Sequence, residues 1–167
     1  QGKPIIALFL TMICCIVLGM GVPTTANYCI MAATCAPILI APEIGINLVC
    51  AHFFVFYFGI VADITPPVAL AAYAGSAIAK APPMKTAINA TRLAIAAFIV
   101  PYILAFNPAM VFINTNAFQV VQICVTSLLG IFGIAAALNG FLFGKLNLLF
   151  KILLIAGGLC MMDPGMM

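Results

Sequence analysis

An acid, a hydroxyl residue and two prolines interrupt an apolar stretch in the middle of the chain: Asp63, Thr65, Pro66 and Pro67, within residues 46–79. The prolines remove backbone donors and clash with the preceding turn, so they must break a helix at this point. The two polar side chains add groups that hydrocarbon cannot solvate, and irregular backbone inside a membrane is tolerated where it is buried in protein or lines a cavity. Because broken helices in transporters bind ions and substrates, the motif predicts a binding site at the break.

A second group of small and polar residues lies within residues 4–42, a stretch without any charge, and consists of Gly19, Gly21, Thr24, Thr25 and Asn27. The two glycines permit close approach of another segment of backbone. Either Thr24 or Thr25 is expected to cap the helix that follows, and the N-terminal end of such a helix attracts anions. We therefore expect this group to form a second part of the binding site.

The composition is that of a membrane protein. Hydrophobic residues make up 66% of the chain, the mean hydropathy is +1.32 and 5% of the residues are charged, whereas a soluble domain carries roughly 25% charged residues. Six bases are too scattered to bind nucleic acid. No motif of a metalloprotease, a serine hydrolase or a P-loop protein is present, so we predict no enzyme activity. The chain shows neither an initial methionine nor a signal peptide, and we interpret it as a piece of a longer protein.

The seven cysteines and the one histidine are expected to be packing residues. No Cys-x-x-Cys pair is present, and each cysteine lies in an apolar stretch, where cysteine behaves as a small hydrophobe. His52 cannot build a site with several histidines, and it precedes the aromatic run at residues 53–58. As an ionisable group within the membrane it keeps the alternative role of a proton carrier.

We predict an all-α polytopic membrane protein whose first element is a re-entrant helical hairpin at residues 5–40. Its first arm, residues 5–18, measures about 21 Å as a helix, against a hydrocarbon core of about 30 Å. Arms this short favour a hairpin whose glycine- and threonine-rich tip ends inside the membrane. The alternatives are two ordinary short helices, or one long helix kinked at Pro23.

Further helices are expected after the hairpin. The apolar stretches predict a discontinuous transmembrane helix, one continuous helix and a C-terminal transmembrane extension that contains two more helices. The predicted ranges are 46–79 for the discontinuous helix, 93–113 for the next, and 118–143 and 153–162 within the extension, residues 114–167.

Basic residues give the predicted orientation. Lys80, Lys85 and Arg92 place the end of the discontinuous helix on the cytoplasmic side, because cytoplasmic loops are rich in basic residues. Glu43 then lies outside, and the hairpin opens outward. Its tip is expected to meet the break near Asp63, where hydroxyls, freed carbonyls and a carboxylate are oxygen ligands suited to a small cation. The residues assigned to cation binding or coupling are Gly19, Gly21, Asp63, Thr65 and Pro66.

Three segments carry a resemblance to a known family. They read Gly-Met-Gly-Val-Pro-Thr-Thr-Ala at 19–26, His-Phe-Phe-Val-Phe-Tyr-Phe-Gly at 52–59 and Asp-Ile-Thr-Pro-Pro-Val-Ala-Leu-Ala at 63–71. The chain resembles the large membrane subunit of tripartite ATP-independent periplasmic (TRAP) transporters, specifically the C-terminal half of fused permeases of the TAXI type. The resemblance implies two inverted repeats, each with a hairpin and a broken helix, of which residues 1–113 match the second.

The resemblance also implies a function. It implies secondary active, cation-coupled import of a small organic anion across the cytoplasmic (inner) membrane by an elevator mechanism, with sodium or a proton as the coupling ion and no other cofactor. The implied partners are a periplasmic substrate-binding protein, a small membrane subunit or fused domain, the first repeat of the same permease and the lipid bilayer. When the chain is matched to the family by position, Thr24, Thr25 and Asn27 fall at the hairpin tip near the substrate. Asp63, Thr65 and Pro66 fall in the broken helix beside the cation site.

One departure from the family pattern concerns the break itself. Relatives with dicarboxylate-type binding proteins read Gly-Leu-Leu-Thr-Pro-Pro-Val-Gly, whereas this chain has Asp63 where no acid is usual and Ala69 in place of the last glycine. Four roles of Asp63 therefore stay open: it binds sodium, it carries a proton, it pairs within the protein, or it caps the second half-helix. Two other functions stay open, an ion channel and a structural membrane subunit without transport.

Overall fold

The computed structural model describes residues 3–113, 115–142, 144 and 146–161. Every regular element that the structure has in these ranges is a helix, as predicted. The chain divides into two compact units, Gln1–Ala105 and Phe106–Met167, which are described separately. Within the described residues, two helical stretches are long and apolar enough to cross a membrane, Pro83–Phe106 and Ala117–Asn139.

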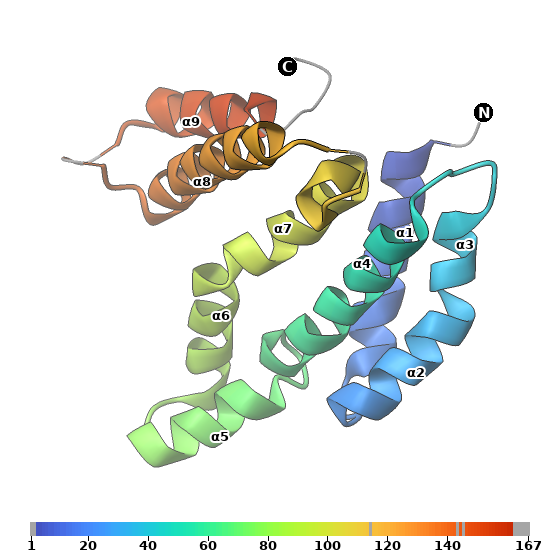
Figure 1. Ribbon diagram of the computed structural model, residues 1–167. Coiled ribbons are helices and arrows are strands. Elements are labelled where there is room, and N and C mark those ends of the chain that lie inside the picture. The colour runs from blue at the N-terminus through green and yellow to red at the C-terminus, as the bar shows by residue number, and fades with distance from the viewer. Residues whose placement is uncertain (1–2, 114, 143, 145, 162–167) are drawn as a thin grey trace. The chain divides into compact units, whose positions relative to one another are not determined.

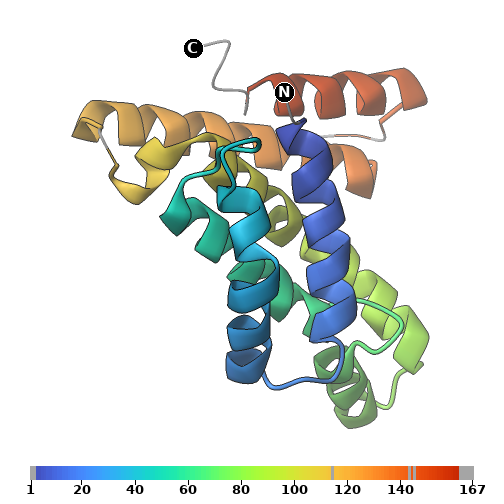
Figure 2. The same cartoon turned by 90° about the vertical axis from the view of Figure 1, so that its right-hand side faces the viewer.

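The first unit opens with two helical arms that run side by side in Figure 1 and Figure 2. The arms consist of α1, Pro4–Gly19, followed by α2, Thr24–Thr34, and α3, Ala36–Ile40. Between the arms the chain turns at Gly21, whose φ of +78° favours glycine. The second arm is interrupted at Cys35 because Pro37 has no N–H to donate to the carbonyl four residues earlier. The arms lie where the sequence predicted them, and the second is kinked.

Helix α4, Leu48–Val61, packs along both arms. It begins where Oδ1 of Asn47 accepts a hydrogen bond from the backbone N–H of Val49 at 3.0 Å, which is a side-chain cap. Phe54 and Phe58 are fully buried and contact each other and Tyr102 edge-on, with ring centroids 4.8 to 5.9 Å apart. These aromatic contacts fix α4 within the first unit.

Helix α4 is interrupted at the predicted place. It runs into a short 3-10 helix, η1, Ala62–Ile64, and the chain becomes helical again only in α5, Leu70–Ala79. The break at Pro66 and Pro67 is therefore confirmed. Ala69 has a φ of +38°, in the left-handed region, at the position where the family pattern has glycine. An alanine there carries about 1 kcal/mol of strain that glycine would avoid.

The helix predicted at 93–113 begins close to the predicted residue but ends early. The structure has α6, Pro83–Leu93, then α7, Ile95–Phe106, and a short 3-10 helix, η2, Pro108–Val111. Two successive prolines begin α6, because proline at the first helical position needs no N–H partner. Lys85 and Arg92, expected in a loop, therefore lie on α6. Helix α7 ends early because the residue before Pro108 disfavours helical backbone.

Besides η2, the described part of the second unit contains a pair of longer helices, α8, Ala117–Asn139, and α9, Leu148–Cys160. They pack closely through small residues, since a Cβ at Gly158 would lie 2.7 Å from the carbonyl oxygen of Gly130. Close backbone approach at glycine is typical of helix pairs in membranes.

Both helices of the extension depart from their predicted ends. Helix α8 ends before residue 143 because Gly140 takes a left-handed φ of +71° and caps it. Helix α9 begins before residue 153 because Oδ1 of Asn147 accepts a hydrogen bond from the N–H of Leu148 at 2.8 Å. The predicted extension continues to residues 162–167, which lie outside the described residues.

Candidate functional site

One buried amide joins the tip of the hairpin to the end of α4. Asn27, 1% exposed, donates from Nδ2 to the carbonyl oxygen of Gly59 at 3.1 Å. A Cβ at Gly59 would lie 2.9 Å from that nitrogen, and a Cβ at Gly19 would lie 2.6 Å from it and 2.8 Å from the Cβ of Ala62. We call Gly19, Asn27 and Gly59 the amide clasp. The tip therefore contacts the residue that precedes Asp63, as the sequence predicted.

The second polar atom of the clasp has no partner. Oδ1 of Asn27 is buried and accepts no hydrogen bond from the part of the chain that the structure describes. The amide orientation is fixed because Nδ2 must face the carbonyl of Gly59, which only accepts. Leaving a buried acceptor unpaired costs about 1 to 3 kcal/mol. Asn27 Oδ1 can therefore accept a hydrogen bond from a donor or coordinate a cation.

The clasp predicts that Gly59 and Asn27 are energetically coupled. Gly59→Ala is expected to lower the free energy of unfolding by about 1 kcal/mol, because its methyl would overlap Nδ2 of Asn27 and displace it from the carbonyl of Gly59, which outweighs the gain from alanine in a helix. In an Asn27→Ala background the same change should cost less, since the overlapping group is gone, and the coupling should be about 1 kcal/mol or more. Unfolding of the detergent-solubilised permease, followed by circular dichroism, measures all four proteins. Equal costs of Gly59→Ala in the two backgrounds would contradict the clasp.

Several carbonyl oxygens around the break are not free, in contrast to the sequence-based expectation. Side-chain hydroxyls bond three of them: Thr65 Oγ1 donates to Val61 O at 2.7 Å, Thr91 Oγ1 to Ile64 O at 3.1 Å, and Tyr73 Oη to Pro67 O at 2.7 Å. The irregular backbone leaves these carbonyls without helical N–H donors, and hydroxyl groups bond them instead. Thr65 gives its proton to a carbonyl, so the lone pairs of its hydroxyl remain available to a cation.

Asp63 lies in η1, half-buried, between the clasp and Pro66. Within the described ranges, no hydrogen bond or ion pair involves its carboxylate. The suggestion that Asp63 caps the second half-helix is wrong, because the N-cap of α5 is Ala69, several residues further on. A half-buried carboxylate next to irregular backbone is suited to bind a cation.

Thr24 and Thr25 are exposed at the N-terminus of α2. The expectation that one of them caps this helix is wrong: Pro23 is the N-cap residue, and no side chain caps the first turn. The fixed φ of proline matches the backbone required just before a helix, so the two threonines become the first helical residues. The first N–H groups of α2 therefore carry no side-chain cap and, with the two hydroxyls, form a surface suited to an anion.

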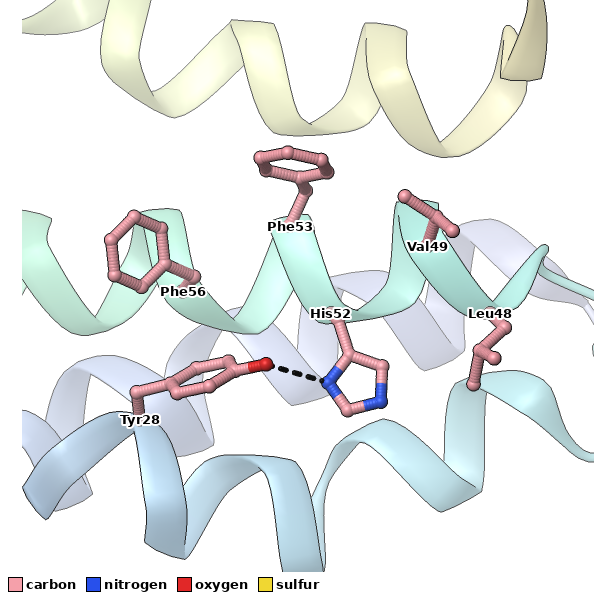
Figure 3. Close-up of a pocket in the computed structure, with 6 residues that line it drawn as sticks. All are labelled: Tyr28, Leu48, Val49, His52, Phe53 and Phe56. Atoms are coloured by element: carbon pink, nitrogen blue, oxygen red, sulfur yellow. Dashed lines mark hydrogen bonds between the residues drawn. The ribbon is translucent and has the colours of Figure 1, made fainter. Parts of the chain in front are cut away.

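A cavity of about 410 Å³ opens between α2 and the first half of α4, and its lining residues are Tyr28, Leu48, Val49, His52, Phe53 and Phe56. Figure 3 shows the tyrosine hydroxyl directed at the imidazole, with Oη 3.0 Å from Nδ1 of His52. Tyr28 also contacts Phe56 edge-on, with ring centroids 5.6 Å apart. The histidine is thus hydrogen-bonded within an aromatic surface, in agreement with the packing role expected from the sequence.

Gly59 belongs to the clasp although it is not among the site residues predicted from the sequence. Its importance depends on contact with Asn27, which is far away in the chain. A local signal exists, because Gly59 directly follows the aromatic run at residues 53–58 inside a helix. Glycine in a helix interior costs about 1 kcal/mol relative to alanine, so its presence there indicates a close approach by another group.

A helical hairpin clasped to an interrupted helix, in a chain this apolar, is typical of membrane transport proteins. The family follows from a comparison with known proteins: the sequence model of the tripartite ATP-independent periplasmic transporter, DctM component, matches residues 1–117. The chain belongs to this family. The match covers the first unit and ends at the first residue of α8. Neither a curated protein nor a solved structure matches the chain.

Family membership supports several predictions made from the sequence. The DctM component is the large integral membrane permease of TRAP transporters, a class of secondary transporters for organic acids. Permeases of this family work with a periplasmic binding protein and a small membrane subunit. The protein is accordingly a transport protein of the membrane and not an enzyme.

Proposed function

We propose that residues 1–113 are the second inverted repeat of a TAXI-type fused TRAP permease, in its C-terminal half, and that residues 114–167 are its C-terminal transmembrane extension. The permease imports a small organic anion, delivered by a periplasmic binding protein, across the cytoplasmic membrane. Import is coupled to a cation, sodium or a proton, and proceeds by an elevator mechanism. The observation that carries this proposal is the amide clasp, which holds the tip of the hairpin against the helix break beside Asp63.

The lengths of the helices support a re-entrant hairpin. Helix α1 has 16 residues, or about 24 Å, which is shorter than the hydrocarbon core of about 30 Å. The second arm is kinked at Cys35 and similarly short. Lys80, Lys85 and Arg92, which follow or lie near the end of α5, favour a cytoplasmic position for that end of the discontinuous helix. The hairpin then enters from the outside, and its tip meets the break within the membrane.

The proposed cation site lies between the hairpin tip and the break. Asp63 supplies a carboxylate, Thr65 supplies hydroxyl lone pairs, and Asn27 supplies the buried Oδ1 that lacks a donor. All are oxygen ligands of the kind that bind small cations in transporters. The other residues predicted for cation binding or coupling act on the backbone. Gly19 and Gly21 allow the hairpin tip to approach the break, and Pro66 keeps the chain irregular there.

The proposed substrate site lies on the exposed side of the same tip. Thr24 and Thr25 present hydroxyl groups beside the uncapped N–H groups of α2. Hydrogen-bond donors and the positive end of the helix dipole both favour a carboxylate. Asn27 contributes here by fixing the first turn of α2 against α4. The first repeat of the permease supplies the rest of the pocket.

Coupling between cation and anion binding follows because the two proposed sites share the hairpin tip. A cation bound between Asp63 and Asn27 stabilises the clasped arrangement, and this arrangement holds the N-terminus of α2 in position for the anion. If the cation raises the affinity for the anion, the anion must raise the affinity for the cation by the same factor. Import of the anion then requires the cation gradient.

Uptake by the full-length permease in proteoliposomes, with its binding protein, tests the proposed function. We expect saturable uptake of an organic acid when a sodium or a proton gradient is imposed, and little uptake without a gradient. Dependence on sodium would support the oxygen site around Thr65, and dependence on protons would favour proton transfer at Asp63. Flux that neither saturates nor depends on a gradient would refute coupled transport and favour a channel.

A further inference from the structure

Two thiols face each other across the hairpin, away from the amide clasp. Sγ of Cys35 lies 3.8 Å from Sγ of Cys14, although the residues are 21 positions apart. Cys14 lies in α1 and is exposed, whereas Cys35 is buried at the junction of α2 and α3. The pair therefore links the first arm of the hairpin to the kink in the second.

The local structure holds Cys35 in this position. Pro37 prevents a continuous helix, so the backbone bends at Cys35, and the hydroxyl of Thr34 lies 3.6 Å from the sulfur. A disulfide has an S–S bond of about 2.05 Å, so small rotations of the two side chains have to bring the sulfurs closer.

We propose that Cys14 and Cys35 form an oxidisable dithiol site, which a two-electron oxidant converts to a disulfide that ties the two arms together. With the azo compound diamide, one thiol adds across the nitrogen–nitrogen double bond. The second thiol displaces the resulting hydrazine from sulfur, so the disulfide forms and both protons end on nitrogen. The inference rests on the contact within the hairpin and not on the proposed transport function.

Cys15 is the natural competitor of Cys14. It is the next residue of α1, is buried, and also interacts with Cys35. Cys14 and Cys35 are the pair whose sulfurs make the contact at 3.8 Å, and we assign the disulfide to them. Cys29, exposed on α2, serves as a matched control from the same arm as Cys35.

The test uses the full-length permease in two variants that keep only two cysteines, Cys14 with Cys35 or Cys14 with Cys29, and replace the others by alanine. Each variant is treated with diamide in membranes, denatured, and labelled with a polyethylene-glycol maleimide. We expect the first variant to lose both labels and to regain them after dithiothreitol, and the control to keep both. Retention of both labels by the first variant would overturn the proposal.

A second measurement needs no substitution. The wild-type permease is oxidised with diamide, blocked, digested and examined by mass spectrometry for disulfide-linked peptides. A linked peptide joining Cys14 to Cys35 is expected. A link from Cys35 to Cys15, or no link to Cys35 at all, would overturn the assignment even where the reduced-cysteine variants fail to insert.

Discussion

Gly19→Ala is expected to lower the free energy of unfolding of the permease by about 2 kcal/mol, and to reduce uptake several-fold. The new methyl would lie 2.6 Å from Nδ2 of Asn27 and 2.8 Å from the Cβ of Ala62. The end of an asparagine side chain can move, but the Cβ of Ala62 is fixed to the backbone of η1. The tip must therefore move away from the break, which separates the proposed cation ligands. Thermal unfolding by circular dichroism and initial uptake rates measure the two effects.

Gly75→Ala is the matched control for this prediction. Gly75 lies in α5, and a Cβ there would have no described atom within 4 Å. Alanine is favoured over glycine in a helix by about 1 kcal/mol, so this variant should be as stable as the wild type or more stable. If Gly19→Ala behaves like Gly75→Ala, the tip is not held against η1 in the way the structure describes.

The helix break could be predicted from the sequence because its cause is local. Pro66 and Pro67 lack N–H groups whatever their surroundings, so an apolar helix that contains them has to be interrupted. The turn at Gly21 follows from the same kind of reasoning, since glycine adopts a positive φ without strain. The break at the two prolines and the turn at Gly21 were therefore placed correctly, whereas the kink beside Pro37 was not predicted.

Helix ends were predicted less well because they depend on a choice between two local signals. At α6, the basic residues Lys85 and Arg92 indicated a loop, whereas Pro83 indicated the start of a helix, and the proline prevailed. At α9, apolar residues before and after Lys151 continue the helix, and the cap at Asn147 sets its start. In both places the position of charge was weighted too heavily.

The clasp itself could not be predicted because it depends on packing. Asn27 and Gly59 are 32 positions apart, and neither residue type specifies the other. A polar side chain near a turn is usually exposed, as Thr24 and Thr25 are, so the burial of Asn27 follows only from the approach of α4. The sequence predicted that the tip and the break meet, but not which atoms join them.

Asp63→Asn is expected to lower gradient-driven uptake about tenfold or more and to abolish its dependence on the coupling cation. The change keeps the shape of the side chain but removes the negative charge, and a loss of about 1.4 kcal/mol in cation binding corresponds to a tenfold weaker affinity. Because Asp63 is half-buried and no described group pairs with it, the fold should be retained. Uptake in proteoliposomes, with and without the gradient, gives the rate and the cation dependence separately.

Glu43→Gln makes the same chemical change in the exposed turn before α4, outside the proposed site, and should leave uptake unchanged. If it lowers uptake as much as Asp63→Asn does, the effect comes from net charge and not from the break. If Asp63→Asn keeps both the rate and the cation dependence, the acid has no part in coupling, and the proposed site reduces to the oxygens of Thr65 and Asn27. Loss of the rate with full cation dependence retained would instead assign Asp63 to a step after cation binding.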